Sequence, residues 1–338
     1  MQIQENKSLT RYNTFGIKAK ARFFCEVHSI KDLREVLRME QYPKKFILGG
    51  GSNMLLTKDI DALVLYINMK GKEVVSQNET HVFLKVMAGE NWHELVLWTM
   101  EQDYGGLENM SLIPGNTGTA PIQNIGAYGV ELKDSFVGCD AMKLDTREIY
   151  TFTKEDCQFG YRDSFFKNEG KGKYIVTSVT FKLTKKNHQL NTSYGDIETQ
   201  LQKNAVKEAT IQEVSKAVIA IRQSKLPDPS VLGNSGSFFK NPVVDKEVFK
   251  NFTGAHPDAP YYKVSDDLYK IPAGWLIEKC GFKGKRFGDA GVHKHQALVL
   301  VNYGNATGTE ILHLAQRIMK SVEEKFGIII TPEVNIID

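Results

Sequence analysis

Cysteine, long apolar runs and net charge are all scarce in this chain of 338 residues. The four cysteines, Cys25, Cys139, Cys157 and Cys280, are scattered and form no C-x-x-C pair. This favours reduced cytosolic thiols over a disulfide or zinc framework. No apolar run is long enough to cross a bilayer, and the first residues lack the basic and apolar stretches of a signal peptide. We therefore expect a cytoplasmic protein with no membrane partner.

The low net charge also limits the choice of partner. The formal net charge is +3, which is too small to indicate nucleic acid but would not repel an anionic ligand. Hydrophobic residues make up 41% of the chain and charged residues 25%, as in ordinary soluble globular proteins. The length predicts roughly two domains of ~150 residues, enough to bury a core without disulfides or metals.

The common nucleotide-binding fingerprints are missing too. A G-G-G-S-N run at residues 49–53 follows a buried strand predicted at 45–48, but Met54 stands where the last glycine of a Rossmann fingerprint should be. No G-x-x-x-x-G-K-[ST] motif occurs. Consecutive glycines let backbone N–H groups turn toward one point, which suits a pyrophosphate, and a plain glycine-rich turn is the alternative. A dinucleotide bound here requires a different fold.

A second glycine-rich stretch extends from Gly105 to Gly129 without a clear period. A loop of this length is unusual unless it is functional. Its small residues permit close approach of the backbone to a large flat ligand, and Thr117, Thr119, Gln123 and Asn124 could add polar contacts. A purely structural Ω-loop is the alternative.

Two further motifs favour structural interpretations when taken alone. The run at residues 233–241 lacks the G-x-S-x-G spacing of a hydrolase and has no histidine nearby to act as base. His293 and His295 would share one face of a strand, but acidic partners at ligand spacing are missing. We therefore predict a turn entering a strand, an ordinary polar strand end, and no metal site.

The hydrophobic periodicity predicts a mixed α+β chain. Helices are predicted at residues 30–39, 91–100, 210–222 and 273–280, and a last amphipathic helix is predicted to end at Gly327. Strands are predicted at residues 21–27, 45–48, 62–67, 82–87, 136–144, 148–152, 174–183, 296–301, 328–330 and 334–337. The proline-rich segment 224–230 is the predicted boundary between two large parts.

The motifs gain specificity from their order along the chain. N-T-F-G at 13–16 is followed by the 49–53 run, I-P-G-N-T-G-T-A-P-I-Q-N-I-G-A-Y-G at 113–129, Y-R-D-S-F-F-K at 161–167, S-K-L-P-D-P at 224–229, G-S-F-F-K-N-P at 236–242, A-G-W-L-I-E at 273–278 and P-E-V at 332–334. In this order, nearly end to end, the set closely resembles the UDP-N-acetylenolpyruvoylglucosamine reductase family, also called UDP-N-acetylmuramate dehydrogenase or MurB. Residues 261–270 look like the tyrosine-bearing loop of one branch of that family.

The resemblance implies an α+β architecture with a two-part FAD-binding fold of the vanillyl-alcohol-oxidase type and a C-terminal α+β substrate-binding domain. The implied parts are residues 1–70 and 71–224 for FAD, 225–325 for the substrate, and a strand segment at 326–338 that returns to the active site. The implied reaction is NADPH-dependent, FAD-mediated reduction of UDP-N-acetylglucosamine enolpyruvate to UDP-N-acetylmuramate. This reaction belongs to peptidoglycan precursor synthesis, and we expect a monomer to catalyse it.

The resemblance also implies roles for individual residues. Ser237 matches the family's proton donor, and Arg162 and Glu333 match groups near the enol intermediate. The implied FAD-binding residues are Gly49, Gly50, Gly51, Ser52, Asn53, Gly115, Thr117, Gly118, Thr119, Gln123, Asn124 and Gly126. The implied substrate-binding residues are Tyr194, Lys225, Asn241, Tyr262, Lys283 and Gln296. Alanine often stands at the position of Ser235 in the family, so this chain has two candidate hydroxyls.

The residue types suit that chemistry. Hydride addition leaves negative charge beside a carboxylate, and the Arg162 guanidinium can bind oxygens in a bidentate way. A serine can protonate such a carbon because a carbanionic enolate is far more basic than water. Two other hypotheses stay open: a flavin oxidase or dehydrogenase of the same fold with another acceptor, and a non-catalytic nucleotide-binding protein.

Overall fold

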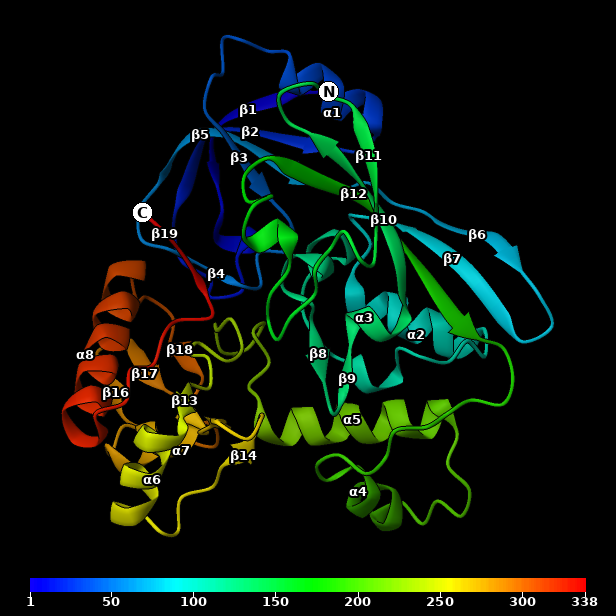
Figure 1. Cartoon of the computed structure of the whole chain (residues 1–338). Coiled ribbons are helices and arrows are strands. Elements are labelled where there is room, and N and C mark those ends of the chain that lie inside the picture. Colours follow the sequence, from blue (N-terminus) through cyan, green and yellow to red (C-terminus); the bar gives the residue numbers. More distant parts are fainter. The chain divides into compact units, whose positions relative to one another are not determined.

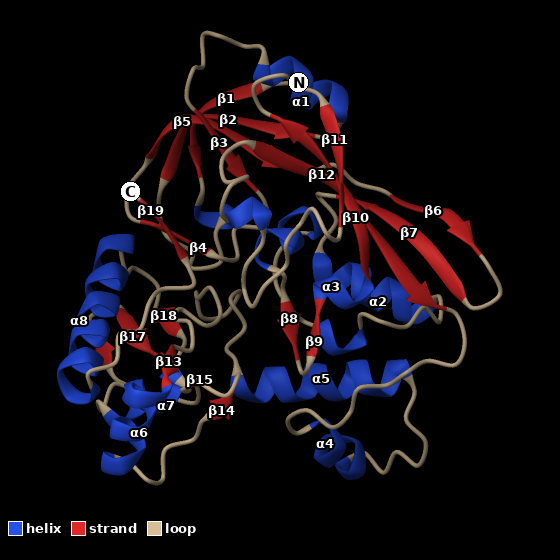
Figure 2. Ribbon diagram, viewed as in Figure 1, coloured by secondary structure: helices blue, strands red, loops and turns tan.

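A computed structural model describes all 338 residues, and the chain divides into two compact units. The first unit contains residues 1–7, 21–50 and 60–224, and the second contains residues 8–20, 51–59 and 225–338. Each unit is therefore assembled from segments that lie far apart in the sequence (Figures 1 and 2).

A four-stranded sheet opens the first unit. Its order is β1 (Ile3–Ser8), β2 (Lys20–Val27), β5 (Ile60–Ile67) and β3 (Lys45–Leu48), and β5 runs parallel to both β2 and β3. Parallel strands of one sheet need a crossover connection, and α1 (Ile30–Leu37) supplies the one from β2 to β3, which lie on either side of β5. Ser29 caps this helix by accepting a hydrogen bond from the Asp32 amide, and Leu33 and Val36 are its buried residues.

A five-stranded antiparallel sheet forms the rest of the scaffold. Its order is β11 (Ile149–Thr153), β10 (Phe136–Lys143), β12 (Tyr174–Thr184), β7 (His81–Met87) and β6 (Lys72–Gln77). Every second residue of β7 is buried, as its alternating sequence predicts. One core cluster joins this sheet to α2 (Trp92–Glu101), α3 (Leu132–Ser135) and the glycine-rich loop between them.

The glycine-rich loop, residues 105–129, has little regular secondary structure but is hydrogen-bonded to a neighbouring helix. It contains the 3₁₀ turns η2 (Glu108–Met110) and η3 (Thr117–Gln123) and leads into the small strands β8 (Gly126–Ala127) and β9 (Val130–Glu131). Below it lies α5 (Ile211–Lys225), which shares a core cluster with α4 (Ile197–Lys203) (Figure 1). The Ser215 hydroxyl of α5 is 2.8 Å from the Ser111 hydroxyl, so the helix is fixed against the loop.

The second unit is built from short strands and three helices. One sheet packs against α8 (Gly308–Phe326) and consists of β16 (Arg286–Phe287), β17 (Ala290–Val292) and β18 (Leu300–Asn302). A second sheet lies near α6 (Lys246–Ala255) and consists of β13 (Val243–Asp245), β15 (Leu268–Lys270) and β14 (Tyr262–Lys263). β19 (Asn335–Ile337) pairs in parallel with β4 (Met54–Leu56), so the chain's last strand joins an early segment. The remaining elements are α7 (Ala273–Lys279), η1 (Thr10–Tyr12) and, in the first unit, η4 (Phe165–Lys167).

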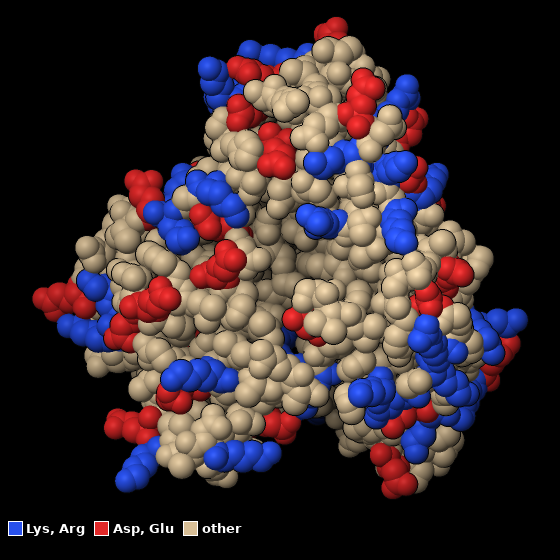
Figure 3. All heavy atoms as spheres, turned by 180° about the vertical axis from the view of Figure 1, so that it is seen from behind, with Lys and Arg blue, Asp and Glu red and all other residues tan.

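The predicted helices are confirmed, including the glycine end of α8, where Gly327 has a φ of 65°. The strand predicted at 296–301 is wrong in its first half, because residues 296–299 form a turn in which the Val299 amide donates to the Gln296 carbonyl. No strand forms at 328–330. None of the helices is both long enough and apolar enough to span a membrane. Basic and acidic side chains alternate over the face drawn in Figure 3, without one dominant sign of charge.

Candidate active site

The two segments predicted to bind a flavin approach each other closely inside the first unit. A Cβ atom added to Gly50 would lie 2.7 Å from the Gly115 Cα, and one added to Gly49 would overlap the Thr119 side chain. Only glycine permits this approach of one backbone to the other. We refer to these two adjoining segments, residues 49–50 and 115–119, as the cradle, because glycine-rich backbone of this kind can approach a phosphorylated ligand closely.

The polar side chains of the loop mainly hold the loop itself. The Thr117 amide and hydroxyl both donate to the Glu90 carbonyl, at 2.8 and 3.1 Å. Asn124 is fully buried, and its amide group donates to Glu131 and to the Gly160 carbonyl while its oxygen accepts from the Lys133 amide. What the loop offers a ligand is therefore chiefly backbone and space, and FAD contacts of these side chains stay predictions.

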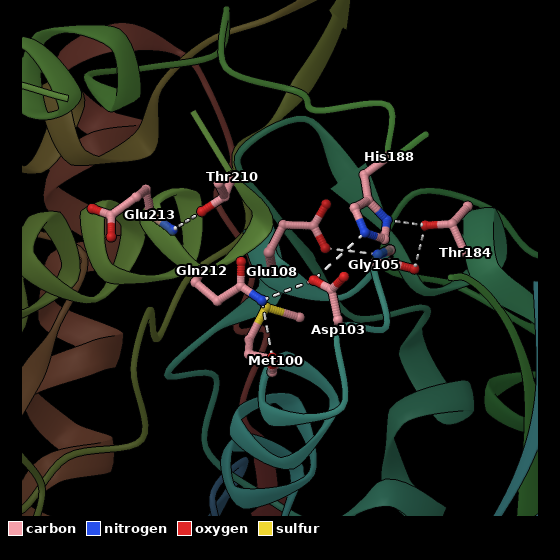
Figure 4. Close-up of polar contacts among 10 residues, drawn as sticks. Met100, Asp103, Gly105, Glu108, Thr184, His188, Thr210, Gln212 and Glu213 are labelled. Carbon is pink, nitrogen blue, oxygen red and sulfur yellow. Dashed lines mark hydrogen bonds and ion pairs between the residues drawn. The ribbon is translucent and has the colours of Figure 1, made fainter. Parts of the chain in front are cut away.

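A polar cluster fixes the start of the loop (Figure 4). Gln212 donates to the Met100 carbonyl and to Asp103, both at 3.0 Å, and the His188 Nδ1 lies 2.7 Å from the Thr184 hydroxyl. The order Thr184, His188, Asp103 resembles a nucleophilic triad. However, the His188 Nε2 is 3.7 Å from the Asp103 carboxylate, and the Thr184 hydroxyl donates to the Gly105 carbonyl. This cluster is structural.

The Arg162 side chain is hydrogen-bonded to the glycine-rich loop. Its Nη2 donates to the Gly126 carbonyl at 2.8 Å, and its own carbonyl accepts from the Lys167 ammonium at 2.9 Å. Arg162, Leu112, Asn124 and Tyr128 all have positive φ angles, of 53°, 60°, 45° and 51°. Non-glycine residues in this conformation are uncommon and tend to gather at functional sites.

The last part of the G-G-G-S-N run belongs to the second unit. Gly51 has a φ of 63°, and a Cβ there would overlap the Tyr12 carbonyl oxygen. The Asn53 carbonyl accepts from both the backbone and the side-chain amide of Asn335, at 3.2 and 2.9 Å. These contacts hold Gly51 and Asn53 within the second unit, and their FAD contacts stay predictions.

The second unit brings Ser237 and Glu333 together. The Glu333 amide donates to the Phe238 carbonyl at 2.8 Å, and the Lys240 amide donates to the Thr331 carbonyl at 2.9 Å. Phe239 and Pro332 face each other in the same antiparallel bridge. The P-E-V segment is thus paired along the G-S-F-F-K motif by an isolated antiparallel bridge, which places the backbones of the predicted acid and the predicted proton donor on adjoining segments.

The two candidate serines differ in what their hydroxyls do. Ser235 is buried, and its hydroxyl donates to the Met54 carbonyl at 3.3 Å and lies 3.2 Å from the Thr14 hydroxyl. Ser237 is half-buried and makes no side-chain hydrogen bond within the chain. Gly236 between them has a φ of 68°, which breaks the extended backbone. Of the two hydroxyls, that of Ser237 is the one not bonded within the chain.

Two predicted substrate residues meet at the first turn of α7. The Asn241 side-chain oxygen accepts from the Ala273 amide at 2.9 Å, and a Cβ on Gly274 would lie 3.3 Å from the Gln296 side-chain oxygen. The other four predicted substrate residues are not brought together with this pair. Lys283 forms an ion pair with Glu278, and Tyr262 is about half exposed on β14. Lys225 is the last residue of α5, and Tyr194 packs beside Gly129 in the first unit.

Sequence reasoning missed two residues of the first unit, His93 and Arg222. The His93 Nδ1 accepts from the Leu112 amide at 2.9 Å, and burial, followed by the Arg222 cation, lowers the pKa of His93. The Arg222 Nε is buried and has no hydrogen-bond partner. The available signal was position: Arg222 follows Ser215 by seven residues, and so it continues the inward face of α5 with a charged residue.

No group of three histidine, cysteine or acidic side chains could hold a metal ion. His293 lies after β17 rather than within a strand, and its ring centroid is 5.5 Å from that of His295. His293 directly follows the last residue of β17, as expected of a polar strand end.

The chain resembles known proteins over its whole length. Residues 228–337 match the C-terminal domain of UDP-N-acetylenolpyruvoylglucosamine reductase, and residues 21–151 match an FAD-binding domain. A UDP-N-acetylenolpyruvoylglucosamine reductase of Flavobacterium johnsoniae is 61% identical, covering 100% of both chains. Proteins with the same name from Chromobacterium violaceum and Pseudomonas aeruginosa are 47% and 44% identical, covering 98% and 99% of both chains.

Solved structures confirm the predicted fold class. The UDP-N-acetylenolpyruvylglucosamine reductase (MurB) of Thermus caldophilus has a TM-score of 0.69 at 22% identity, covering 100% of this chain and 98% of that one. A solvent-stable cholesterol oxidase has a TM-score of 0.51 at 10% identity, covering 98% and 86%. The chain has the mixed α and β content of an FAD-binding domain joined to a family-specific C-terminal domain.

Substitution of Gly50 tests the cradle. Gly50→Ala should weaken FAD binding by about tenfold or more, or ~1.4 kcal/mol, because the new methyl group would force the 49–50 and 115–119 backbones apart. FAD affinity is measured by fluorescence titration of the apoprotein. The matched control is Gly254→Ala on α6, where an added Cβ meets nothing within 4 Å. Equal FAD affinity in the two variants would remove the 49–50 segment from the cofactor site.

The lowered pKa of His93 predicts a pH dependence of stability. In the unfolded chain His93 takes up a proton near its usual pKa of ~6.5, whereas in the folded protein it stays neutral to lower pH. The unfolded state then binds more protons, so His93 costs stability as the pH falls below ~6.5. His93→Asn, which keeps an acceptor for Leu112, should flatten the decline in unfolding free energy between pH 7 and 5, measured by urea titration.

The exposed His28 provides the control for this experiment. The His28→Asn variant is compared with His93→Asn in the same titration. Equal pH slopes for wild type and His93→Asn would show that the buried imidazole is not the source of the dependence.

Proposed function

This chain belongs to the UDP-N-acetylenolpyruvoylglucosamine reductase family, and from that premise we propose that it uses NADPH to reduce UDP-N-acetylglucosamine enolpyruvate to UDP-N-acetylmuramate. The proposed reaction is a step of peptidoglycan precursor synthesis, and through the cell wall it would serve cell shape and division. Its two nucleotide substrates place it in the cytoplasm, and the proposed working form is a monomer.

The different hydrogen bonding of the Ser235 and Ser237 hydroxyls is the observation that supports this reaction. Ser237 makes no side-chain hydrogen bond and directly precedes Phe238, whose carbonyl accepts from the Glu333 amide, whereas the neighbouring Ser235 hydroxyl is used within the fold. A reaction that protonates a carbon needs such a positioned donor, and an oxidase that passes electrons to O2 does not. This favours the reductase over another flavin oxidase.

The cofactor fits the residues of the first unit. A Cβ on Gly50 would collide with the Gly115 backbone, so the contact between these segments requires glycine, and the FAD-binding domain match covers both of them. The proposed contacts come mainly from the backbones of residues 49–53 and 115–126. The chemistry that FAD supplies when bound is transfer of a hydride from NADPH to the enolpyruvyl double bond.

The chain's own groups would complete the reaction. Arg162 would hold the substrate carboxylate and the charge that develops beside it, which requires a fixed cation in a site without water. Ser237 would give its Oγ proton to the carbon next to the carboxylate. Glu333, held by its backbone beside Phe238, would orient the intermediate and is expected to act in its protonated form, since a second negative charge there would be unfavourable.

Binding of the sugar nucleotide is assigned to Tyr194, Lys225, Asn241, Tyr262, Lys283 and Gln296. Lys225 suits the diphosphate, because an ammonium offers a point charge to phosphate oxygens. Asn241 and Gln296 are already placed together at the start of α7.

Absorbance of the bound flavin provides the direct test of function. Anaerobic addition of NADPH should bleach the visible absorption of the purified protein, and UDP-N-acetylglucosamine enolpyruvate should restore it. Steady-state turnover with this substrate should exceed NADPH oxidation by O2 alone by at least about 10²-fold, as expected for a positioned acid–base site. Restoration by O2 but not by the sugar nucleotide would indicate an oxidase, and a colourless protein that binds no FAD would exclude both.

The serine assignment predicts a difference between half-reactions. Ser237→Ala should leave flavin reduction by NADPH intact and slow reoxidation by the substrate by about 10²–10⁴-fold, the usual contribution of a general acid. Ser235→Ala should be mild in both half-reactions but lower thermal stability, because it removes the bond to the Met54 carbonyl. Stopped-flow absorbance follows each half separately. The assignment fails if Ser235→Ala is the variant that blocks reoxidation.

A further inference from the structure

A buried asparagine of the first unit joins two segments that are far apart in the sequence. Asn109 lies in η2 and is 1% exposed. Its side-chain amide group donates to the Tyr128 carbonyl at 3.0 Å and to the Asn191 carbonyl at 2.8 Å. Tyr128 stands near the end of the glycine-rich loop, and Asn191 lies between β12 and α4. One side chain therefore holds both backbones.

The two donations explain why an amide stands at this position. The opposite orientation of the Asn109 amide would place its oxygen against two carbonyl oxygens, so the chemistry of the partners fixes the orientation. The Oδ1 of Asn109 is buried and accepts no hydrogen bond from the chain. A buried acceptor without a donor costs stability, and a leucine would fill similar space without that cost. What the amide provides is its two N–H donors.

The two segments joined by this amide also pack closely against each other. The Asn191 side chain donates to the Gly129 carbonyl at 3.3 Å. Gly129 has a φ of 79°, and a Cβ there would lie 3.1 Å from the Tyr194 Cβ. Gly195 has a φ of 69°, and a Cβ there would lie 3.5 Å from the Tyr128 ring. The segment that carries Tyr194 is thus packed against the end of the glycine-rich loop.

Tyr194 is not held by its own polar group. The residue is 52% exposed, and its hydroxyl makes no hydrogen bond within the chain. An exposed side chain on a loop loses conformational entropy when a ligand orders it, and a fixed backbone reduces that loss. Three residues before Tyr194, the hydrogen bond from Asn109 to the Asn191 carbonyl anchors this backbone.

We propose that Asn109 is a positioning residue for substrate binding, because its two hydrogen bonds fix the backbone that presents the Tyr194 hydroxyl to the sugar nucleotide. This proposal rests on the proposed function, which assigns Tyr194 to that substrate. Asn109 is buried and acts through Tyr194 rather than by touching the substrate. Fixing the loop beforehand increases the fraction of molecules that are competent to bind, and the dissociation constant falls by the same factor.

Two substitutions remove the donors with little change in volume. Asn109→Asp keeps the shape of the side chain, and Asn109→Leu is uncharged and leaves no buried polar atom. Each should raise the dissociation constant of the sugar nucleotide by about tenfold, as expected when hydrogen bonds that order a binding residue are lost. Isothermal titration calorimetry on the FAD-loaded oxidised enzyme measures it. The KM for the sugar nucleotide should rise while kcat stays near wild type.

A double-mutant cycle separates positioning from general support of the fold. Tyr194→Ala should raise the dissociation constant by itself. Asn109→Leu added to Tyr194→Ala should raise it no further, because both changes remove the same interaction with the substrate. Full additivity of the two changes would overturn the proposal, since Asn109 would then affect binding by a route that does not include Tyr194. A wild-type dissociation constant in both Asn109 variants would overturn it as well.

Asn204 provides the matched control for charge. It is exposed at the end of α4 in the same unit, where its side-chain oxygen accepts from Gln200. Asn204→Asp adds a negative charge without removing an anchor of the Tyr194 segment, and should leave the dissociation constant at its wild-type value. If Asn204→Asp and Asn109→Asp raised it equally while Asn109→Leu did not, charge alone would explain the effect and the proposal would fail.

Amide hydrogen exchange gives a second readout that needs no sugar nucleotide. Residues 189–196 should exchange faster in both Asn109 variants than in wild type, while the exchange of β12 stays unchanged. Unchanged exchange at residues 189–196 would overturn the proposal, because the hydrogen bonds would then not fix this segment. Failure of the proposed function would appear separately, as a wild-type protein that does not bind the sugar nucleotide.

Discussion

The close approach of two glycine backbones is the constraint on which the cofactor site depends. Gly50 and Gly115 leave no room for a side chain between residues 49–50 and 115–119, and Gly118 is equally confined against Ala88. Such contact gives the loop a surface of backbone amides and carbonyls rather than side chains. It also requires every other polar group of the loop to be satisfied locally, because the loop has almost no regular structure to do so.

That requirement explains the use of the loop's polar residues. Thr117 and Asn124 look like ligand contacts in the sequence because they alternate with glycines. In the structure they bond to Glu90, Glu131 and neighbouring backbone, replacing the hydrogen bonds that a helix or sheet would have provided. A side chain that holds a loop and one that binds a ligand have the same composition, and only the hydrogen-bond partners distinguish them.

The sequence predicted most of the fold because its long elements have strong periodicity. The strands at 82–87 and 174–183 and the helix at 210–222 differ from the observed bounds by a few residues at most, and the last helix ends before Gly327 as predicted. Elements of two or three residues, such as β8, β14 and β16, could not be predicted, since their formation depends on pairing partners distant in sequence. The turn at 296–299 was read as strand because it is apolar and lies directly before β18.

Site prediction had a different limit. The order of motifs identified Ser237 and Glu333, but no pattern showed that a backbone ladder joins them or that the Ser235 hydroxyl is already bonded. Arg222 was missed because a single arginine near the end of an amphipathic helix is normally solvated. That its Nε is buried without an acceptor is a property of three-dimensional packing.

These features together make the folded apoprotein less favourable than the loaded one. Residues such as Leu112 and Tyr128 have left-handed backbones, each of which costs of order 1–3 kcal/mol. A ligand that binds only the native state offsets such costs by mass action, in proportion to the logarithm of its concentration over its dissociation constant. A flavin bound beside this loop would therefore stabilise the very loop that binds it. The strained backbone is then part of an arrangement that is complete only with the cofactor present.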